Sequence, residues 1–117
     1  MSTGLQIFAG VLIAAVILAA VAIRLVPMPP EVWHVDPADV TPPESPNFAL
    51  HRGEDAFVAE GSLAEVAAAL TAVADTRGAE RIAGDLAAGH ATFVERSRLV
   101  GFPDAISIRL TEADGRT

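Results

Sequence analysis

The sequence contains no cysteine, which excludes disulfide bonds and zinc sites built on thiolates. Lysine is also absent, so all eight basic residues are arginines. Positive charge is scarce in residues 27–117, which contain seven arginines and fifteen acidic residues. Phosphate binding needs clustered positive charge. The composition therefore argues against a nucleic-acid partner.

Charge of either sign is almost missing from residues 5–26, LQIFAGVLIAAVILAAVAIRLV, whose only polar side chains are Gln6 and Arg24. As a helix this segment is about 33 Å long, enough for a hydrocarbon core of about 30 Å. Its thirteen Leu, Ile, Val and Phe residues favour insertion by about 4 to 8 kcal/mol. One mid-membrane arginine costs only about 3 kcal/mol. We predict one transmembrane helix after a short tail, residues 1–4, with the lipid bilayer as partner.

A cleaved signal peptide is the alternative interpretation, since Ala20-Val21-Ala22 fits the A-x-A cleavage pattern. The apolar run is longer than a signal peptide needs, and residues 1–4, MSTG, lack a basic residue. We therefore predict a retained signal anchor in the inner membrane of a bacterium, with the remaining chain in the periplasm.

A proline-rich linker is predicted at residues 27–47, which hold seven of the eight prolines. Proline fixes φ and removes a backbone donor, so an extended segment is expected. Its WHVDP motif contributes Trp33, His34 and Asp36. Trp33 is either an interfacial anchor or a plug on the folded domain. His34 and Asp36 are only two potential metal ligands, so we predict neither a metal nor a cofactor.

A small domain is predicted over residues 48–117. Its best-specified element is a helix at 63–75, with Ser62 and Glu65 as a capping box and Gly78 as the stop. Strands are expected near Phe57-Val58 and at 79–86, 91–99 and 105–112. The order β-α-β-β-β predicts an α+β fold in which one helix covers an antiparallel sheet.

The strand at 91–99 does not alternate cleanly, so its pairing with the next strand stays open. If Leu99 pairs with Ala105, the isoleucine face of the next strand meets arginines. If Leu99 pairs with Ile106, that face meets Glu95 and Ser97. Either way polar groups lie beside the core face, through an edge bulge or through arginine stems that cover apolar surface.

Arg96, Ser97 and Asp104 are the candidate site residues of this hairpin. A bidentate ion pair between Arg96 and Asp104 would fix the GFPD turn or build a polar pocket on it. A hydrolase-like site using all three is the alternative, although Ser97 has no histidine at a motif spacing and His90 is expected in a turn.

The sequence resembles a bacterial membrane-anchored family called domain of unknown function 1499. The resemblance rests on WHVDP at 33–37, and on TFVERSRLVGFPDAISIRL, above all residues 96–97 and 101–104. It runs from Arg24 to the last residue and implies no reaction.

The Asp114-Gly115 dipeptide predicts a type I′ turn, followed by only two residues. The family adds a strand, a loop and a helix after this turn, so the resemblance implies a chain cut short at its C-terminus. We predict a membrane-anchored, envelope-facing module that binds another protein or a small ligand. The alternatives are the hydrolase-like enzyme and a non-functional truncated gene product.

Overall fold

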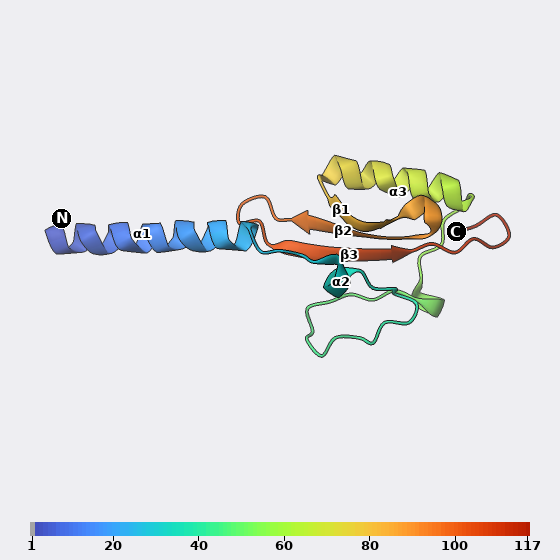
Figure 1. The fold of residues 1–117 in the computed structure, drawn as a ribbon, viewed down its shortest axis with the longest axis horizontal. Coiled ribbons are helices and arrows are strands. Elements are labelled where there is room, and N and C mark those ends of the chain that lie inside the picture. The colour runs from blue at the N-terminus through green and yellow to red at the C-terminus, as the bar shows by residue number, and fades with distance from the viewer. Residues whose placement is uncertain (1) are drawn as a thin grey trace. The chain divides into compact units, whose positions relative to one another are not determined.

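The computed structural model describes residues 2–117, which form two compact units. The helix–loop unit contains α1 together with Arg96–Asp104, and the α+β unit contains Met28–Glu95 together with Ala105–Thr117. The elements, in chain order, are α1 (Thr3–Arg24), α2 (Pro30–Trp33), a 3₁₀ helix (Gly53–Asp55), α3 (Leu63–Arg77), β1 (Glu80–Asp85), a 3₁₀ helix (Leu86–Ala88), β2 (His90–Arg96) and β3 (Pro103–Arg109). The α+β class is confirmed, with a three-stranded antiparallel sheet (Figure 1).

The predicted apolar helix is present as α1, displaced by two residues toward the N-terminus. Ser2 begins it, because the hydroxyl accepts a bond from the Leu5 amide at 3.2 Å. Its 22 residues are long and apolar enough to cross a membrane, as a signal sequence also is, and the rest of the described chain buries none of its apolar window. Arg24 lies in the last turn, where positive charge suits the helix dipole.

The second long helix, α3, forms as its capping residues predict. The Ser62 hydroxyl accepts a bond from the Glu65 amide, and the Glu65 carboxylate accepts one from the Ser62 amide. Gly78 ends the helix with φ of 69°, which costs glycine no strain. A further acid, Glu112, accepts a bond from the Leu63 amide at 2.6 Å. Three side chains therefore satisfy amides at the start of α3.

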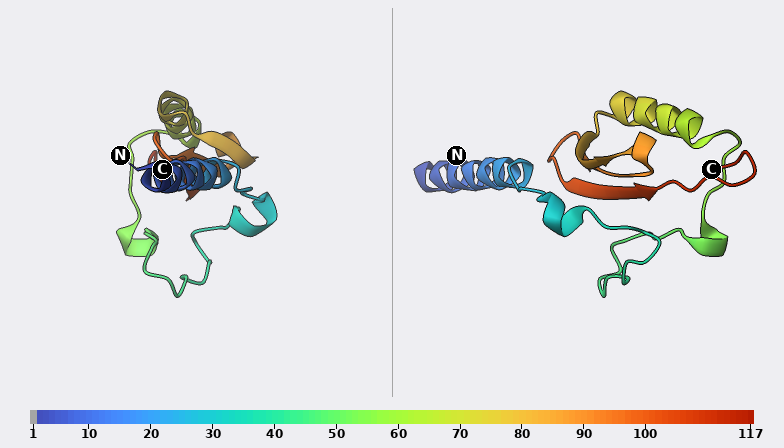
Figure 2. Two further views of the ribbon diagram at one scale, coloured as in Figure 1. Left: turned by 90° about the vertical axis from the view of Figure 1, so that its left-hand side faces the viewer. Right: turned by 45° about the vertical axis from the view of Figure 1, so that its right-hand side comes forward.

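The sheet has the order β1-β2-β3, and α3 covers one of its faces (Figures 1 and 2). The buried core of this layer consists of Ala67 from α3, Leu86, and the alternate β2 residues Ala91 and Phe93. Partly buried apolar side chains complete it, among them Leu63, Leu70, Ile108 and Leu110. The β1–β2 ladder is irregular between Arg81 and Ala83.

The open question of the β2–β3 pairing is answered by the side chains. Phe93 packs with the cluster that includes Ile108. Glu95, two residues beyond Phe93, shares its face and accepts a bond from Arg77 Nε at 3.0 Å. The polar group beside the core is therefore Glu95, neutralised by the last turn of α3. Leu99 lies in the turn between the strands, so neither predicted pairing of Leu99 is formed.

The strand predicted near Phe57-Val58 is wrong. Both side chains are exposed, so the apolar pair has no face to bury. Pairing begins two residues later: Ala59 and Thr117 exchange backbone bonds of 2.8 and 2.9 Å, and the Gly61 amide donates to the Gly115 carbonyl at 2.9 Å. Only an isolated bridge, not a strand, precedes α3.

The type I′ turn at Asp114-Gly115 is confirmed. Both residues have positive φ, 53° and 76°, and Ala113 and Arg116 exchange backbone bonds of 2.9 and 3.1 Å. The two residues after the turn pair with Ala113 and with the segment that leads into α3.

The proline-rich linker is not simply extended. Pro30 occupies the first position of α2, where its fixed φ and missing donor fit a helix start. Beyond α2 the chain turns at Asp36, whose carbonyl accepts from the Val40 amide at 3.0 Å. Arg52 Nη1 donates to the Val40 carbonyl at 2.8 Å, which closes the loop that follows.

Gly84 in β1 generates a prediction about stability. It has φ of 73°, and an added Cβ would collide with the His90 carbonyl of β2. We expect Gly84→Ala to lower the free energy of unfolding by about 3 kcal/mol, from backbone strain and the clash together. Urea denaturation of the full chain in detergent, followed by circular dichroism, measures it.

Gly53→Ala is the matched control, because Gly53 has φ of 58° but open space around the added atom. It should cost only the strain, about 1 kcal/mol. Equal losses for the two variants would contradict the close approach of β1 and β2.

Candidate functional site: the docked WHVDP segment

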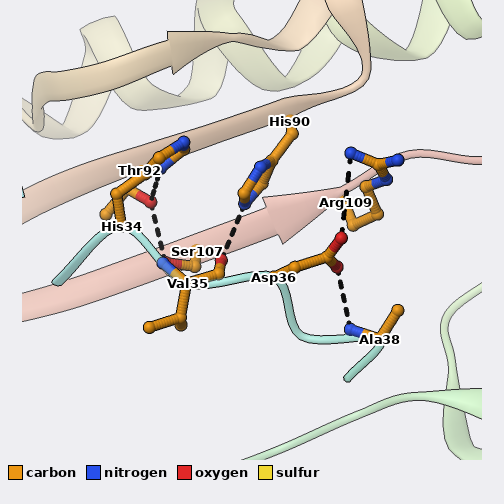
Figure 3. Close-up of polar contacts among 8 residues, drawn as sticks. All are labelled: His34, Val35, Asp36, Ala38, His90, Thr92, Ser107 and Arg109. Carbon is orange, nitrogen blue, oxygen red and sulfur yellow. Dashed lines mark hydrogen bonds and ion pairs between the residues drawn. The ribbon is translucent and has the colours of Figure 1, made fainter. Parts of the chain in front are cut away.

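The WHVDP segment, residues 33–37, is fastened to the sheet on the face opposite α3 (Figures 2 and 3). This face follows from alternation along the strands, because Thr92 and Ser107 point away from the core that Phe93 and Ile108 enter. Contacts from His34, Val35 and Asp36 reach His90, Thr92, Ser107 and Arg109, which all alternate onto this face. A segment early in the chain therefore covers what would be the open side of a two-layer fold.

Thr92 is the centre of the cluster and has no exposed surface. Its hydroxyl lies 2.7 Å from His34 Nδ1 and 2.7 Å from the Ser107 hydroxyl. Ser107 also donates to the Trp33 carbonyl at 3.1 Å. Each hydroxyl has one proton, so the proton order follows: Ser107 donates to Trp33, Thr92 donates to Ser107, and His34 Nδ1–H donates to Thr92.

The two histidines of the cluster stack on each other, with ring centroids 4.1 Å apart and planes inclined by 20°. His90 Nε2 lies 2.7 Å from the Val35 carbonyl, which can only accept, so this nitrogen carries a proton. His90 was expected in a turn, but it is the first residue of β2. Flat ring contact and one bond on each ring hold His34 and Val35 in place.

Asp36 fastens the far end of the segment. Its Oδ2 lies 3.8 Å from Arg109 Nη1, and its Oδ1 accepts from the Ala38 amide at 2.9 Å. Both charged side chains are partly exposed, so solvent screening limits the ion pair to about 1 kcal/mol at most. The Asp36–Ala38 bond shapes the turn that leaves the sheet.

The polar groups of this cluster hold the WHVDP segment on the sheet. The hydroxyls of Thr92 and Ser107 are used within the chain, and no buried side-chain polar atom of residues 2–117 lacks a partner. Across the same described residues, no three potential ligands gather where a metal ion would fit. The backbone carbonyl of Trp33 accepts a bond from Ser107, while the residue as a whole is 41% exposed.

Arg96 has a different role from the one predicted. Its guanidinium donates to the carbonyls of Ile23, Val26 and Gly101 at 3.2, 2.7 and 3.2 Å. The last carbonyls of a helix have no partner within it, and Arg96 supplies one at the end of α1. Within residues 2–117 no ion pair joins Arg96 to Asp104, which is exposed.

Arg24 makes the converse contact within the same helix–loop unit. Its Nη2 donates to the carbonyls of Arg98 and Leu99 at 2.7 and 2.8 Å. We call these two sets of bonds the arginine clasp: Arg96 holds the end of α1, and Arg24 holds the β2–β3 loop. Gly101 lies against the stem of Arg24 with φ of 80°, a position that only glycine fits without strain.

Ser97 shapes the loop through its side chain. Its hydroxyl accepts bonds from the amides of Gly101 and Phe102, both at 3.0 Å. The structure thus places Arg96 and Ser97 at the start of one loop, each engaged with backbone groups. Thr92, Ser107 and His90 were not among the predicted site residues. The sequence carried no clear signal for them, because polar residues such as His90, Thr92 and Ser107 alternate with apolar residues as they do along many half-buried strands.

An open groove lies between α3 and the segment at the end of β1 that contains Asp85 and Ala87. It has a volume of about 420 Å³ and a floor of small side chains. The lining residues are Ala64, Ala67, Ala68, Thr71, Ala72, Asp75, Asp85 and Ala87. Small side chains let another backbone approach closely, and the two aspartates add negative charge.

No family model matches the chain, and neither a curated protein nor a solved structure matches it.

Removal of the Thr92 hydroxyl tests how the WHVDP segment is held. Thr92→Val keeps the shape of the side chain but leaves His34 Nδ1 without an acceptor and takes one donor from the Ser107 hydroxyl, which keeps its bond to the Trp33 carbonyl. We expect a loss of about 2 kcal/mol in the free energy of unfolding, and faster hydrogen exchange at residues 33–37. Hydrogen exchange followed by mass spectrometry separates this local release from global unfolding.

Thr76→Val is the matched control. Thr76 lies on the exposed side of α3 and bonds only to the Ala72 carbonyl of its own helix. It should leave exchange at residues 33–37 unchanged. Unchanged exchange in Thr92→Val as well would show that the segment is held by something other than this cluster.

Proposed function

We propose that this protein is a single-pass membrane protein whose α+β unit faces the bacterial envelope and binds another envelope protein. The observation that carries the proposal is α1, a 22-residue apolar helix that the rest of the described chain leaves unburied. An apolar surface of this length suits lipid far better than water. The net negative charge of the α+β unit fits a domain that stays in solution.

Retention of α1 is proposed over cleavage, and the arginine clasp lies on the C-terminal side of the candidate cleavage motif. The candidate cleavage motif, Ala20-Val21-Ala22, lies inside the helix. Arg96 bonds to the carbonyls of Ile23 and Val26, just beyond that motif. These contacts all lie after the motif and would be present in either form, so the proposal of a retained helix rests on the length of the apolar run and on the lack of a basic residue in residues 1–4.

The resemblance to the membrane-anchored family belongs to this proposal. Each of its two motifs lies at a place where segments far apart in the sequence are held together. WHVDP supplies the segment docked on the sheet, and residues 96–97 with 101–104 supply the loop that the clasp holds. Both motifs have structural duties, which supports a binding module over the hydrolase-like alternative.

The groove along α3 is where we place the protein partner. Its open shape and alanine floor suit a packed helix or strand better than an enclosed small molecule. The α+β unit contains five arginines and fourteen acidic residues, so a segment with basic side chains would complement it. The partner is therefore expected to present a segment with basic residues and with small side chains at the contact.

Membrane anchoring predicts the outcome of a fractionation. The protein should stay with membranes after a carbonate wash, and Ile13→Arg with Ile17→Arg should release it, because two central arginines oppose insertion by about 6 to 8 kcal/mol. Ile13→Leu with Ile17→Leu is the control and should stay bound. A mature chain that begins at Ile23 would instead identify a cleaved signal.

The groove predicts a position-dependent cross-link. A photoreactive residue in place of Ala68, which lines the groove, should capture one envelope protein of defined mass in cells. Ala69 is the matched position: it is exposed on the same helix but does not line the groove. Equal capture from both positions would rule the groove out as the partner's binding surface.

A further inference from the structure

We propose that the β2–β3 loop, residues 97–102, lies on the membrane and inserts Leu99 and Phe102 into the headgroup–acyl boundary of the bilayer. The inference rests on the proposed function, because it requires α1 to cross that bilayer. The occupant of this apolar surface is lipid, specifically an anionic phospholipid surface.

The arginine clasp places the loop at the right depth. Arg24 is the last residue of α1, and in a helix that spans the bilayer it lies near the headgroups. Its guanidinium bonds to the carbonyls of Arg98 and Leu99 at 2.7 and 2.8 Å. In the opposite sense, Arg96 at the start of the loop donates to the carbonyls of Ile23 and Val26 at the end of α1. The loop is thereby held against the end of α1, within reach of the interface.

The exposed side chains of the helix–loop unit are unusually apolar for a surface in water. Leu99 is 90% exposed, Leu25 is 74% exposed and Phe102 is 57% exposed. Leu99 and Phe102 lie in the six-residue loop 97–102, whose shape Ser97 fixes by accepting two bonds from backbone amides. Large apolar side chains on a fixed loop next to a membrane helix are typical of interfacial insertion.

The distribution of charged residues between the two units also supports contact of the loop with the membrane. The helix–loop unit contains three arginines and one acidic residue, whereas the α+β unit contains five arginines and fourteen acidic residues. Arg98 is exposed, and its side chain makes no hydrogen bond or ion pair with the described residues 2–117. An anionic headgroup would attract this loop and repel the acidic remainder. The chain thus presents its net positive part at the end of its membrane helix.

Single cysteines test the inference in the full chain, which has no cysteine of its own. Leu99→Cys, Val16→Cys and Val58→Cys are each labelled with an environment-sensitive fluorophore and reconstituted into phosphatidylcholine vesicles that contain phosphatidylglycerol. All three native side chains are mostly exposed, so labelling should not disturb the fold. Lipids with a quencher at the headgroup–acyl boundary or at the acyl centre then report the depth of each label.

We expect quenching at position 16 from the acyl centre, at position 99 from the boundary, and little at position 58. Quenching at 16 without quenching at 99 would overturn the inference and leave the membrane anchor intact. No quenching at 16 would overturn the anchor, and the inference with it. Equal quenching at 58 and 99 would also overturn the inference, because the contact would not be specific to the loop.

Arg98→Gln tests the lipid charge. In the phosphatidylglycerol vesicles it should lower the membrane-bound fraction of the loop, read from the label at position 99, about fivefold. In pure phosphatidylcholine vesicles the same substitution should change little. An equal effect in both vesicles, or none in either, would show that anionic headgroups do not attract the loop.

Discussion

The buried hydroxyl of Thr92 is the group on which the arrangement of the α+β unit depends. A buried hydroxyl must be hydrogen-bonded, and this one has no exposed surface. Its two partners belong to different segments, His34 from the proline-rich stretch and Ser107 from β3. The Thr92 hydroxyl therefore specifies which residue of β3 lies beside Thr92. It also specifies which segment covers this face of the sheet. The apolar face under α3 supplies most of the burial, whereas the polar face supplies the specificity.

The same requirement, that backbone polar groups find partners, explains the helix–loop unit. The last turn of α1 leaves carbonyls without partners inside the helix, and Arg96 donates to two of the carbonyls at this end. Arg24 in turn satisfies two carbonyls of the loop. Arginine suits both positions because its planar guanidinium presents several donors in a fixed fork and stays charged at a membrane surface. A chain with no lysine uses arginine for every such contact.

Features governed by neighbours in the sequence were predictable. The capping box at Ser62 and Glu65, the stop at Gly78 and the turn at Asp114-Gly115 each depend on residues within a few positions of one another, and all are present. The strand near Phe57 was wrong because two apolar residues in sequence say nothing about whether a face exists to bury them. Arg96 was assigned to Asp104, its neighbour across the hairpin, because the α1-end carbonyls that it binds belong to residues 70 and 73 positions earlier in the chain. Ser97 was predicted as a site residue because it lies in a motif. Ser107 was not, because it fits the ordinary alternation of a strand, yet it is Ser107 that contacts the linker.

The bonds of the docked segment also constrain the order of folding. His34 and Thr92 are 58 positions apart, and Val35 and Ser107 are 72 apart. Contacts at such separations carry a large loop-closure entropy and form late. The surface that receives the segment does not exist until β2 and β3 have paired, so during synthesis the segment must wait beside the membrane until nearly the whole sheet has been made. Release of the docked segment does not require the sheet to open, because the segment can leave while the sheet and α3 keep their own core. It is therefore a candidate for the first cooperative unit to open, and its departure would bring water to Thr92 while the helical side stays closed.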